Sequence, residues 1–205
     1  MRVRVRLMMA TIGVAGSVAL STGLVAANWD FPFTSAQEWY IACGYGCGLH
    51  GGDAAYALDL NYLTGGDTDC GAAVLAVRAG QVRRSACSGK KSDSGYGCHV
   101  EVLHGEVRTG TRSLYAHLMD PGSAKKRDER VCEGETIGRV GKTGSGGGSS
   151  CHLHFHLRTN GGRTAALPEP IDGRKNGAQE CAAHTGLDEW QRFYSCIGYN
   201  CPQPQ

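Results

Sequence analysis

The sequence predicts a mainly β fold, with one small antiparallel β domain that disulfides stabilise. Short β-favouring runs separated by glycine dominate the middle of the chain, and 31 of its 205 residues are glycine. No long segment there carries apolar residues at helical spacing. Ten cysteines point to covalent crosslinks. The chain beyond the first 27 residues amounts to about one domain, enough to bury one core.

The first segment, residues 1–27, has the features of a secretory signal peptide. A basic head, Met1–Arg6, precedes an uncharged apolar run that ends in small residues at Ala27. Cleavage near Asn28 gives a secreted or periplasmic bacterial protein without a stable membrane span. The alternative is a retained anchor, because the run approaches the roughly 20 residues that span a bilayer.

Residues 28–165 are expected to form the β domain. Six β-favouring runs predict its strands: Tyr56–Leu60, Ala73–Val77, Gln81–Arg84, Cys98–Leu103, Arg112–Leu118 and His152–Leu157. The glycine-rich stretch 141–150 is expected to be a loop beside the last of these strands. Residues 166–205 are expected to form an irregular, cysteine-containing extension packed on the same domain, with one short helix at Leu187–Tyr194.

All ten cysteines follow the apolar run, and an even number in an exported chain predicts disulfides. Cys43 and Cys47 are the closest pair, and zinc–thiolate ligation is the competing interpretation of their spacing. No clear second pair accompanies them, which favours a disulfide. The formal net charge of +2 is too small to indicate a nucleic-acid partner.

The most informative stretch has histidines at 152, 154 and 156 that alternate with Leu153, Phe155 and Leu157. On a strand, alternate side chains share one face, so the imidazoles project together and the apolar side chains pack on the other face. Neighbouring imidazoles on that face are about 7 Å apart, which is too far for two of them to bind one zinc ion easily. We therefore expect one ligand and one neighbour that acts on substrate, and the spacing does not say which is which.

A catalytic zinc ion usually takes three protein ligands and one water, so further ligands must come from elsewhere. His50 lies in a glycine-rich loop, and Asp59 lies in an apolar strand-like run where an unpaired carboxylate is costly. Asp53 is the second candidate for the carboxylate. His117 also lies in an apolar strand, where a satisfied core histidine is the alternative.

Together these residues resemble the lysostaphin, LytM and β-lytic family of zinc endopeptidases that cut peptidoglycan. The resemblance runs from about Cys47 to Arg158. It rests on five pieces in the family's order: His50 with Asp59, Ala73–Val82, Tyr115–Leu118, Gly134–Gly144 and His152–Phe155.

The resemblance implies that His50, Asp59 and His154 bind one zinc ion and that His117 and His152 serve catalysis. It also implies a narrow groove over the metal and peptidoglycan peptides as the partner. The chain departs from the family in having Ser149-Ser150-Cys151 before the histidine pair, and in having a histidine at 156, a position for a ligand-supporting or substrate contact. The tyrosine that some members use beside the oxyanion has only Tyr45 and Tyr56 as nearby candidates.

The expected function is that of a secreted, monomeric zinc metalloendopeptidase that hydrolyses peptide bonds of peptidoglycan with a zinc-activated water. His152 or His117 would take the proton of the water and the other would assist, with the two roles left undivided. One alternative is an inactive exported binding or regulatory domain of the same fold. The other is a zinc protease that acts on soluble proteins. All five site positions are filled, which favours an enzyme.

Overall fold

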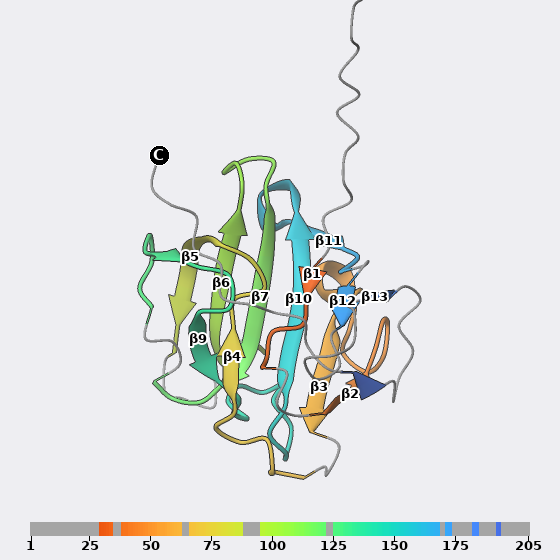
Figure 1. The fold of residues 1–205 in the computed structure, drawn as a ribbon. Helices are drawn as coiled ribbons and strands as arrows, with labels where there is room; N and C mark the ends of the chain where they lie inside the picture. The colour runs from red at the N-terminus through yellow and green to blue at the C-terminus, as the bar shows by residue number, and fades with distance from the viewer. Residues whose placement is uncertain are drawn as a thin grey trace, which may run out of the picture.

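The computed structural model describes residues 29–34, 38–62, 66–87, 95–121, 125–168, 171–173, 182–184 and 192–193. One large antiparallel sheet dominates the described chain (Figure 1). Its strands run in the spatial order β14-β2-β3-β10-β7-β6-β5-β8, and β11 pairs with the end of β10. Their bounds are β2 Trp39–Cys43, β3 Leu58–Tyr62, β5 Gly80–Ala86, β6 Cys98–His104, β7 Thr111–Leu118, β8 Arg130–Val131, β10 Leu153–Thr159, β11 Thr164–Ala166 and β14 Arg192–Phe193.

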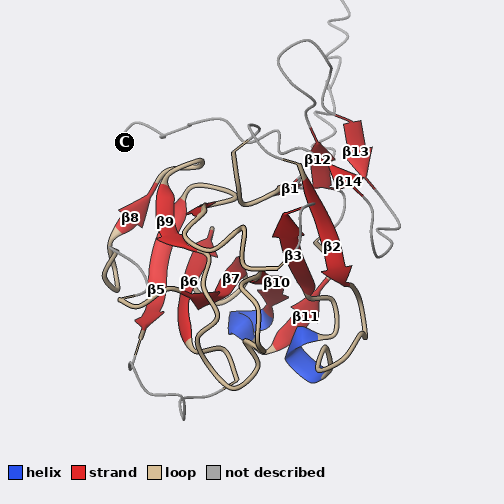
Figure 2. Cartoon of the chain, turned by 90° about the horizontal axis from the view of Figure 1, so that it is seen from below, coloured by secondary structure: helices blue, strands red, loops and turns tan. Residues whose placement is uncertain are grey.

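Two smaller sheets and two short helices complete the described fold. β4 (Ala73–Leu75) pairs with β9 (Thr136–Arg139). A three-stranded sheet has the order β1-β12-β13, with bounds Trp29–Asp30, Ile171–Gly173 and Ala182–His184. The 3-10 turns are η1 (Gly52–Ala54) and η2 (Asn160–Gly162). Figure 2 shows β9 on one side of the large sheet and both turns on the other.

The hydrophobic core lies between the large sheet and the β4–β9 pair. On β10, Leu153, Phe155 and Leu157 are almost fully buried, as the alternation of the sequence predicts. They pack in one cluster with residues of the neighbouring strands and of the β4–β9 pair, among them Val74, Val100, Tyr115 and Ile137. The opposite face of β10 carries the histidines, so the core fixes the direction in which they point.

The antiparallel β fold and all six predicted strands are confirmed, with ends that differ by a few residues. The stretch 141–150 is a loop apart from an isolated bridge at Gly141. Strands β2 and β9 were not predicted. In the C-terminal extension, the described pieces β12 and β13 are strands rather than irregular chain, because they pair with each other and β12 pairs with β1.

Two predictions about the ends of the chain concern residues that lie mainly outside the described ones. Residues 1–27, the expected signal peptide, lie wholly outside them. Of the expected helix at 187–194, only Arg192–Phe193 is described, and a helix is wrong there because the two residues pair with β2 as strand β14. Among the described residues, no helix is long and apolar enough to cross a membrane.

Three disulfides join described cysteines: Cys43 to Cys47, Cys70 to Cys151 and Cys87 to Cys98. The expectation of disulfides is therefore confirmed. The zinc–thiolate alternative for Cys43 and Cys47 is wrong, because their sulfur atoms are bonded to each other. Two of the three crosslinks lie beside histidines of interest, since Cys47 precedes His50 and Cys151 directly precedes His152.

Candidate metal centre and active site

The pairing of β10 with β3 brings His154 and Asp59 together. The two residues are direct cross-strand partners, although 94 residues separate them in the chain. The Nδ1 atom of His154 lies 2.9 Å from Oδ1 of Asp59. His154 is buried, and Asp59 is partly accessible at the edge of a cavity. The sheet register therefore creates this pair.

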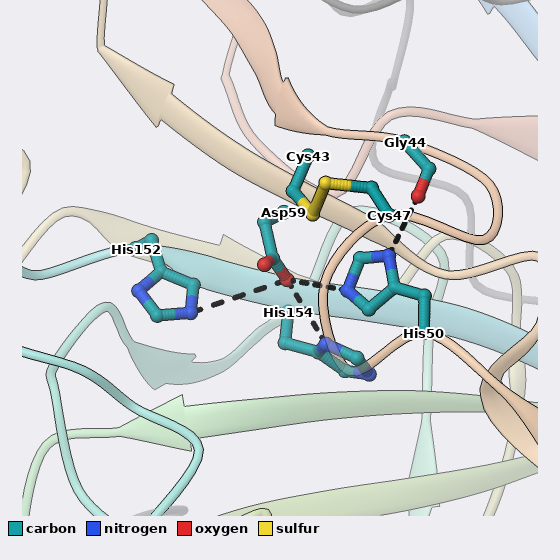
Figure 3. The surroundings of a disulfide bond; sticks show 7 residues. All are labelled: Cys43, Gly44, Cys47, His50, Asp59, His152 and His154. Carbon is teal, nitrogen blue, oxygen red and sulfur yellow. Dashed lines mark hydrogen bonds and ion pairs between the residues drawn. A yellow bond between two sulfur atoms is a disulfide. The ribbon is translucent and has the colours of Figure 1, made fainter.

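His50 reaches the same carboxylate from the loop between β2 and β3. The Cys43–Cys47 disulfide and a hydrogen bond from His50 N to the carbonyl of Cys47, 2.8 Å, hold this loop. The ring Nδ1–H donates to the carbonyl of Gly44 at 2.7 Å, which leaves Nε2 unprotonated in the neutral ring. That Nε2 atom lies 3.2 Å from Oδ1 of Asp59. Figure 3 shows His50, His152 and His154 around the Asp59 carboxylate.

This donor set fits a tetrahedral zinc ion. Two ligand atoms bound to zinc at 2.0–2.1 Å lie about 3.3 Å apart, close to the two distances from Asp59 to the imidazoles. Imidazoles that share one ion have ring centres about 5 Å apart by the same geometry, and the rings of His50 and His154 are 5.0 Å apart. Cys43 also lies near His50 and Asp59, but its disulfide removes the thiolate that zinc would need.

The local electrostatics favour the ionised form of Asp59 and the neutral form of His154, which are the forms that can bind a cation. Burial opposes ionisation of Asp59, but the adjacent imidazoles of His154 and His50 hold the pKa of its carboxyl well below the usual range. Burial lowers the pKa of His154, against the effect of Asp59, and so favours the neutral ring. Burial also opposes charge on His50, yet the hydrogen bond and charge of Asp59 raise its pKa. Metal ligands must be unprotonated, so the raised pKa of His50 opposes binding of an ion as the pH falls.

His117 lies at the end of β7 in a strained backbone conformation. Its φ of 58° is in the left-handed region, which costs a residue other than glycine about 1–3 kcal/mol. The backbone N–H donates to the carbonyl of Tyr96 at 3.0 Å, and the ring Nδ1–H donates to the carbonyl of Thr143 at 2.9 Å. Burial and the neighbouring His152 lower its pKa to about 4, so the ring is neutral and its Nε2 atom can accept a proton.

His152 completes the group from the residue before β10. Its ring centre is 4.8 Å from that of His117, and its Nε2 atom is 4.0 Å from Oδ1 of Asp59. Its Nδ1–H donates to the carbonyl of Ser150 at 3.2 Å, which again leaves Nε2 as the acceptor. The ring of His117 is also 5.6 Å from that of His154. The five predicted site residues therefore converge on one place.

A cavity of about 290 Å³ is lined by four of these five residues, His50, Asp59, His117 and His154. One wall is backbone: Gly146 N donates to the carbonyl of Gly95 at 3.0 Å, and a methyl group at Gly146 would come within 2.7 Å of that oxygen and 3.3 Å of the His117 ring. Leu49, which is 85% exposed, also lines the cavity. Glycine backbone and an apolar side chain therefore line the cavity beside the histidines.

Other sequence candidates lie outside this cluster. Asp53 forms an ion pair with Arg158, at 2.8 Å, and does not face His50 and His154. Tyr45 and Tyr56 contact each other, with ring centres 5.6 Å apart, and neither lines the cavity. Because Arg158 pairs with Asp53, Asp59 is the aspartate that is available to an ion.

Tyr96 lines the cavity, and the sequence analysis missed it. Its ring centre is 5.5 Å from that of His154, and its hydroxyl accepts a hydrogen bond from Arg158 at 3.0 Å. The hydroxyl is therefore directed toward Arg158, and the ring forms part of the cavity wall. The available signal was an aromatic residue between two glycines, Gly95 and Gly97, directly before a strand.

Comparisons with known proteins agree with this architecture. A curated relative, the DD-carboxypeptidase/endopeptidase Mpg of Neisseria meningitidis serogroup B, is 38% identical over 85 residues, which are 40% of this chain and 18% of the relative. The chain thus spans less than a fifth of that protein. The M23 metalloprotease pseudoalterin, from the deep sea, is 19% identical to this chain and has a TM-score of 0.55. The match covers 82% of this chain and 99% of pseudoalterin, so the two share the fold. The catalytic domain of lysostaphin from Staphylococcus simulans has 23% identity and a TM-score of 0.46 over 64% and 88% of the two chains.

The model of peptidase family M23 matches residues 64–166, half of the chain. The matched segment contains His117, His152 and His154, and it begins after His50 and Asp59. The sequence resemblance to the lysostaphin and LytM type is therefore confirmed, and this chain belongs to peptidase family M23.

Proposed function

We propose that this chain is an exported zinc metalloendopeptidase that hydrolyses peptide bonds of peptidoglycan, with one zinc ion held by His50, Asp59 and His154. One observation carries the proposal: two imidazole nitrogens lie within 3.2 Å of the same carboxylate oxygen, beside two more histidines whose Nε2 atoms are available. Membership of a peptidase family supports the reaction class.

When bound, zinc lowers the pKa of its water toward 7 and polarises a carbonyl group. The chain supplies the proton transfers. His152 and His117 each have Nδ1–H fixed by a backbone carbonyl, so each presents Nε2 as a base. The Nε2 atom of His152 lies 4.0 Å from Oδ1 of Asp59, and we assign to His152 the proton of the attacking water. His152 would then give that proton to the leaving amine, and His117, whose Nε2 atom is unprotonated, would accept a hydrogen bond from the attacking water.

The cavity supports a peptide substrate with small, uncharged side chains near the cleaved bond. Gly95 and Gly146 line the cavity without side chains, and Leu49 adds an apolar side chain to its lining. The name of the Neisseria relative, a DD-carboxypeptidase/endopeptidase, supports cell-wall peptides as the substrate class. Export through the segment 1–27 and action as a monomer complete the proposal.

The test is digestion of purified bacterial peptidoglycan by the exported chain, with mass analysis of released peptides and casein as a parallel substrate. His154→Ala should lose zinc, measured by metal analysis after dialysis. His117→Ala should retain zinc and lose rate by about 10²–10⁴-fold. Zinc-loaded protein that releases no wall peptides would favour a binding or regulatory domain, and cleavage of casein alone would favour a protease of soluble proteins. Full activity in either variant would refute the site.

A further inference from the structure

Behind His154 lies a second buried histidine that the reaction above does not use. His156 follows on the same face of β10 and is fully buried. Its Nδ1 atom is 3.0 Å from Nε2 of His154. Its own Nε2 atom is buried and has no hydrogen-bond partner within the described part of the chain. An imidazole so placed is either a packed core residue or part of the metal centre.

The protonation of His154 decides between these two roles. A neutral imidazole carries one proton, and a ring that binds a metal through Nδ1 must carry it on Nε2. The Nδ1 atom of His154 is the one that faces Asp59, at 2.9 Å, so ligation there leaves Nε2–H as a donor. The acceptor within reach of that donor is Nδ1 of His156.

We propose that His156 is a positioning residue for the metal centre, which accepts a hydrogen bond from Nε2–H of His154 and so presents the Nδ1 lone pair of His154 to the ion. This inference rests on the metal ligands of the proposed function. The proton of neutral His156 then lies on Nε2, the atom that has no partner. A buried donor without a partner costs about 1–3 kcal/mol, an expense that packing alone does not explain.

His156 itself is not placed to be a ligand. Its Nδ1 atom meets the side of the His154 ring that faces away from Asp59, because Nδ1 and Nε2 are on opposite sides of an imidazole. Tyr96 covers it, with ring centres 5.7 Å apart in an edge-on contact. Outer hydrogen bonds of this kind fix the orientation and basicity of metal-bound imidazoles, and their loss typically weakens metal binding by about 10–100-fold.

A spectroscopic test needs no substitution. In the zinc-loaded chain labelled with ¹⁵N-histidine, the proton between the two rings should show its one-bond coupling to Nε2 of His154 and a weaker coupling across the hydrogen bond to Nδ1 of His156. A proton attached to Nδ1 of His156, or two rings with no coupling between them, overturns the proposal.

Matched variants test the effect on the ion. His156→Leu fills the site without an acceptor, whereas His156→Asn keeps an oxygen at the position of Nδ1. His99→Leu is the control, since His99 is also buried with an unpaired Nε2 but donates from Nδ1 to the carbonyl of Gly97 and contacts no proposed ligand. Zinc dissociation constants come from competition with a chelator, and unfolding of the metal-free variants reports on packing.

The expected result is zinc binding about 10–100-fold weaker in His156→Leu, with substantial recovery in His156→Asn and no change in His99→Leu. Equal affinity in His156→Leu and the unsubstituted chain overturns the inference and leaves the proposed function intact. Equal weakening in the Leu and Asn variants also overturns it, in favour of packing. If the unsubstituted chain binds no zinc, both the inference and the proposed function are wrong.

Discussion

Removal of the disulfides one at a time should separate the crosslink that stabilises the fold from the one that serves the metal centre. The bonds Cys43–Cys47, Cys87–Cys98 and Cys70–Cys151 join residues 4, 11 and 81 positions apart. In the chain-entropy model, crosslinks of these spans stabilise a protein by about 2, 3 and 4.5 kcal/mol, because longer loops restrict the unfolded chain more. Replacement of both cysteines of a pair by alanine should lower the free energy of unfolding in that order.

The assay is urea unfolding with excess chelator, so that bound metal adds nothing to the stability. Zinc affinity should follow a different order. Cys151 stays anchored without its sulfur, because its carbonyl accepts from Asn61 and its N–H donates to Asp67, at 3.0 and 2.8 Å. The Cys43–Cys47 bond instead closes the turn whose carbonyls at Gly44 and Cys47 accept from His50, and its loss should weaken zinc binding by about tenfold, at the lower end of outer-contact effects. The reasoning is refuted if the 81-residue crosslink proves no more stabilising than the four-residue one.

Three further predictions concern single side chains. Asp59→Asn should abolish zinc retention in dialysis. Asp53→Asn breaks only the ion pair with Arg158 and should leave zinc retention unchanged. The opposite outcome would make Asp53 the metal ligand in place of Asp59. Burial lowers the pKa of His104 to about 4, below its unfolded value. The free energy of unfolding should therefore fall by about 2–3 kcal/mol as the pH drops from 6.5 toward 4. In urea titrations, a His104→Gln variant should lose less stability over this range. Asp69 is buried with no hydrogen-bond partner of good geometry in the described chain, and burial raises its pKa to about 6. Its stabilising contribution is lost as the pH rises from 3.8 through 6, so Asp69→Asn should stabilise the protein by about 1–3 kcal/mol at pH 8 and not at pH 4, as calorimetry can check.

The strands were predictable where local pattern alone determines them. His152–Leu157 alternates polar and apolar residues, so both the strand and the direction of its histidines follow from a two-residue period. The order of the strands was not predictable, because β10 pairs with β3 and β7 through contacts between distant residues. Strand β2 escaped prediction because one of its partners, β14, lies about 150 residues further along the chain, a pairing that no local pattern reveals.

The candidate site shows the same division. The histidines at 50, 117, 152 and 154 stand out in sequence by their glycine-rich or apolar surroundings, and the structure brings them together. The choice between Asp53 and Asp59 needed the position of Arg158, which no local pattern reveals. Tyr96 reaches the cavity only because its loop lies against that of Gly146, a contact between segments about fifty residues apart.

The glycine contacts beside His117 limit how this site can change. A methyl group at Gly97 would collide with the backbone of Thr143 and Gly144, and one at Gly146 with the carbonyl of Gly95. At these positions backbone packs directly against backbone, so a substitution can neither shorten a neighbouring side chain nor fill a gap. The lining of the cavity is therefore open to change chiefly at Leu49, an exposed side chain that can be exchanged without disturbing the backbone that holds His117.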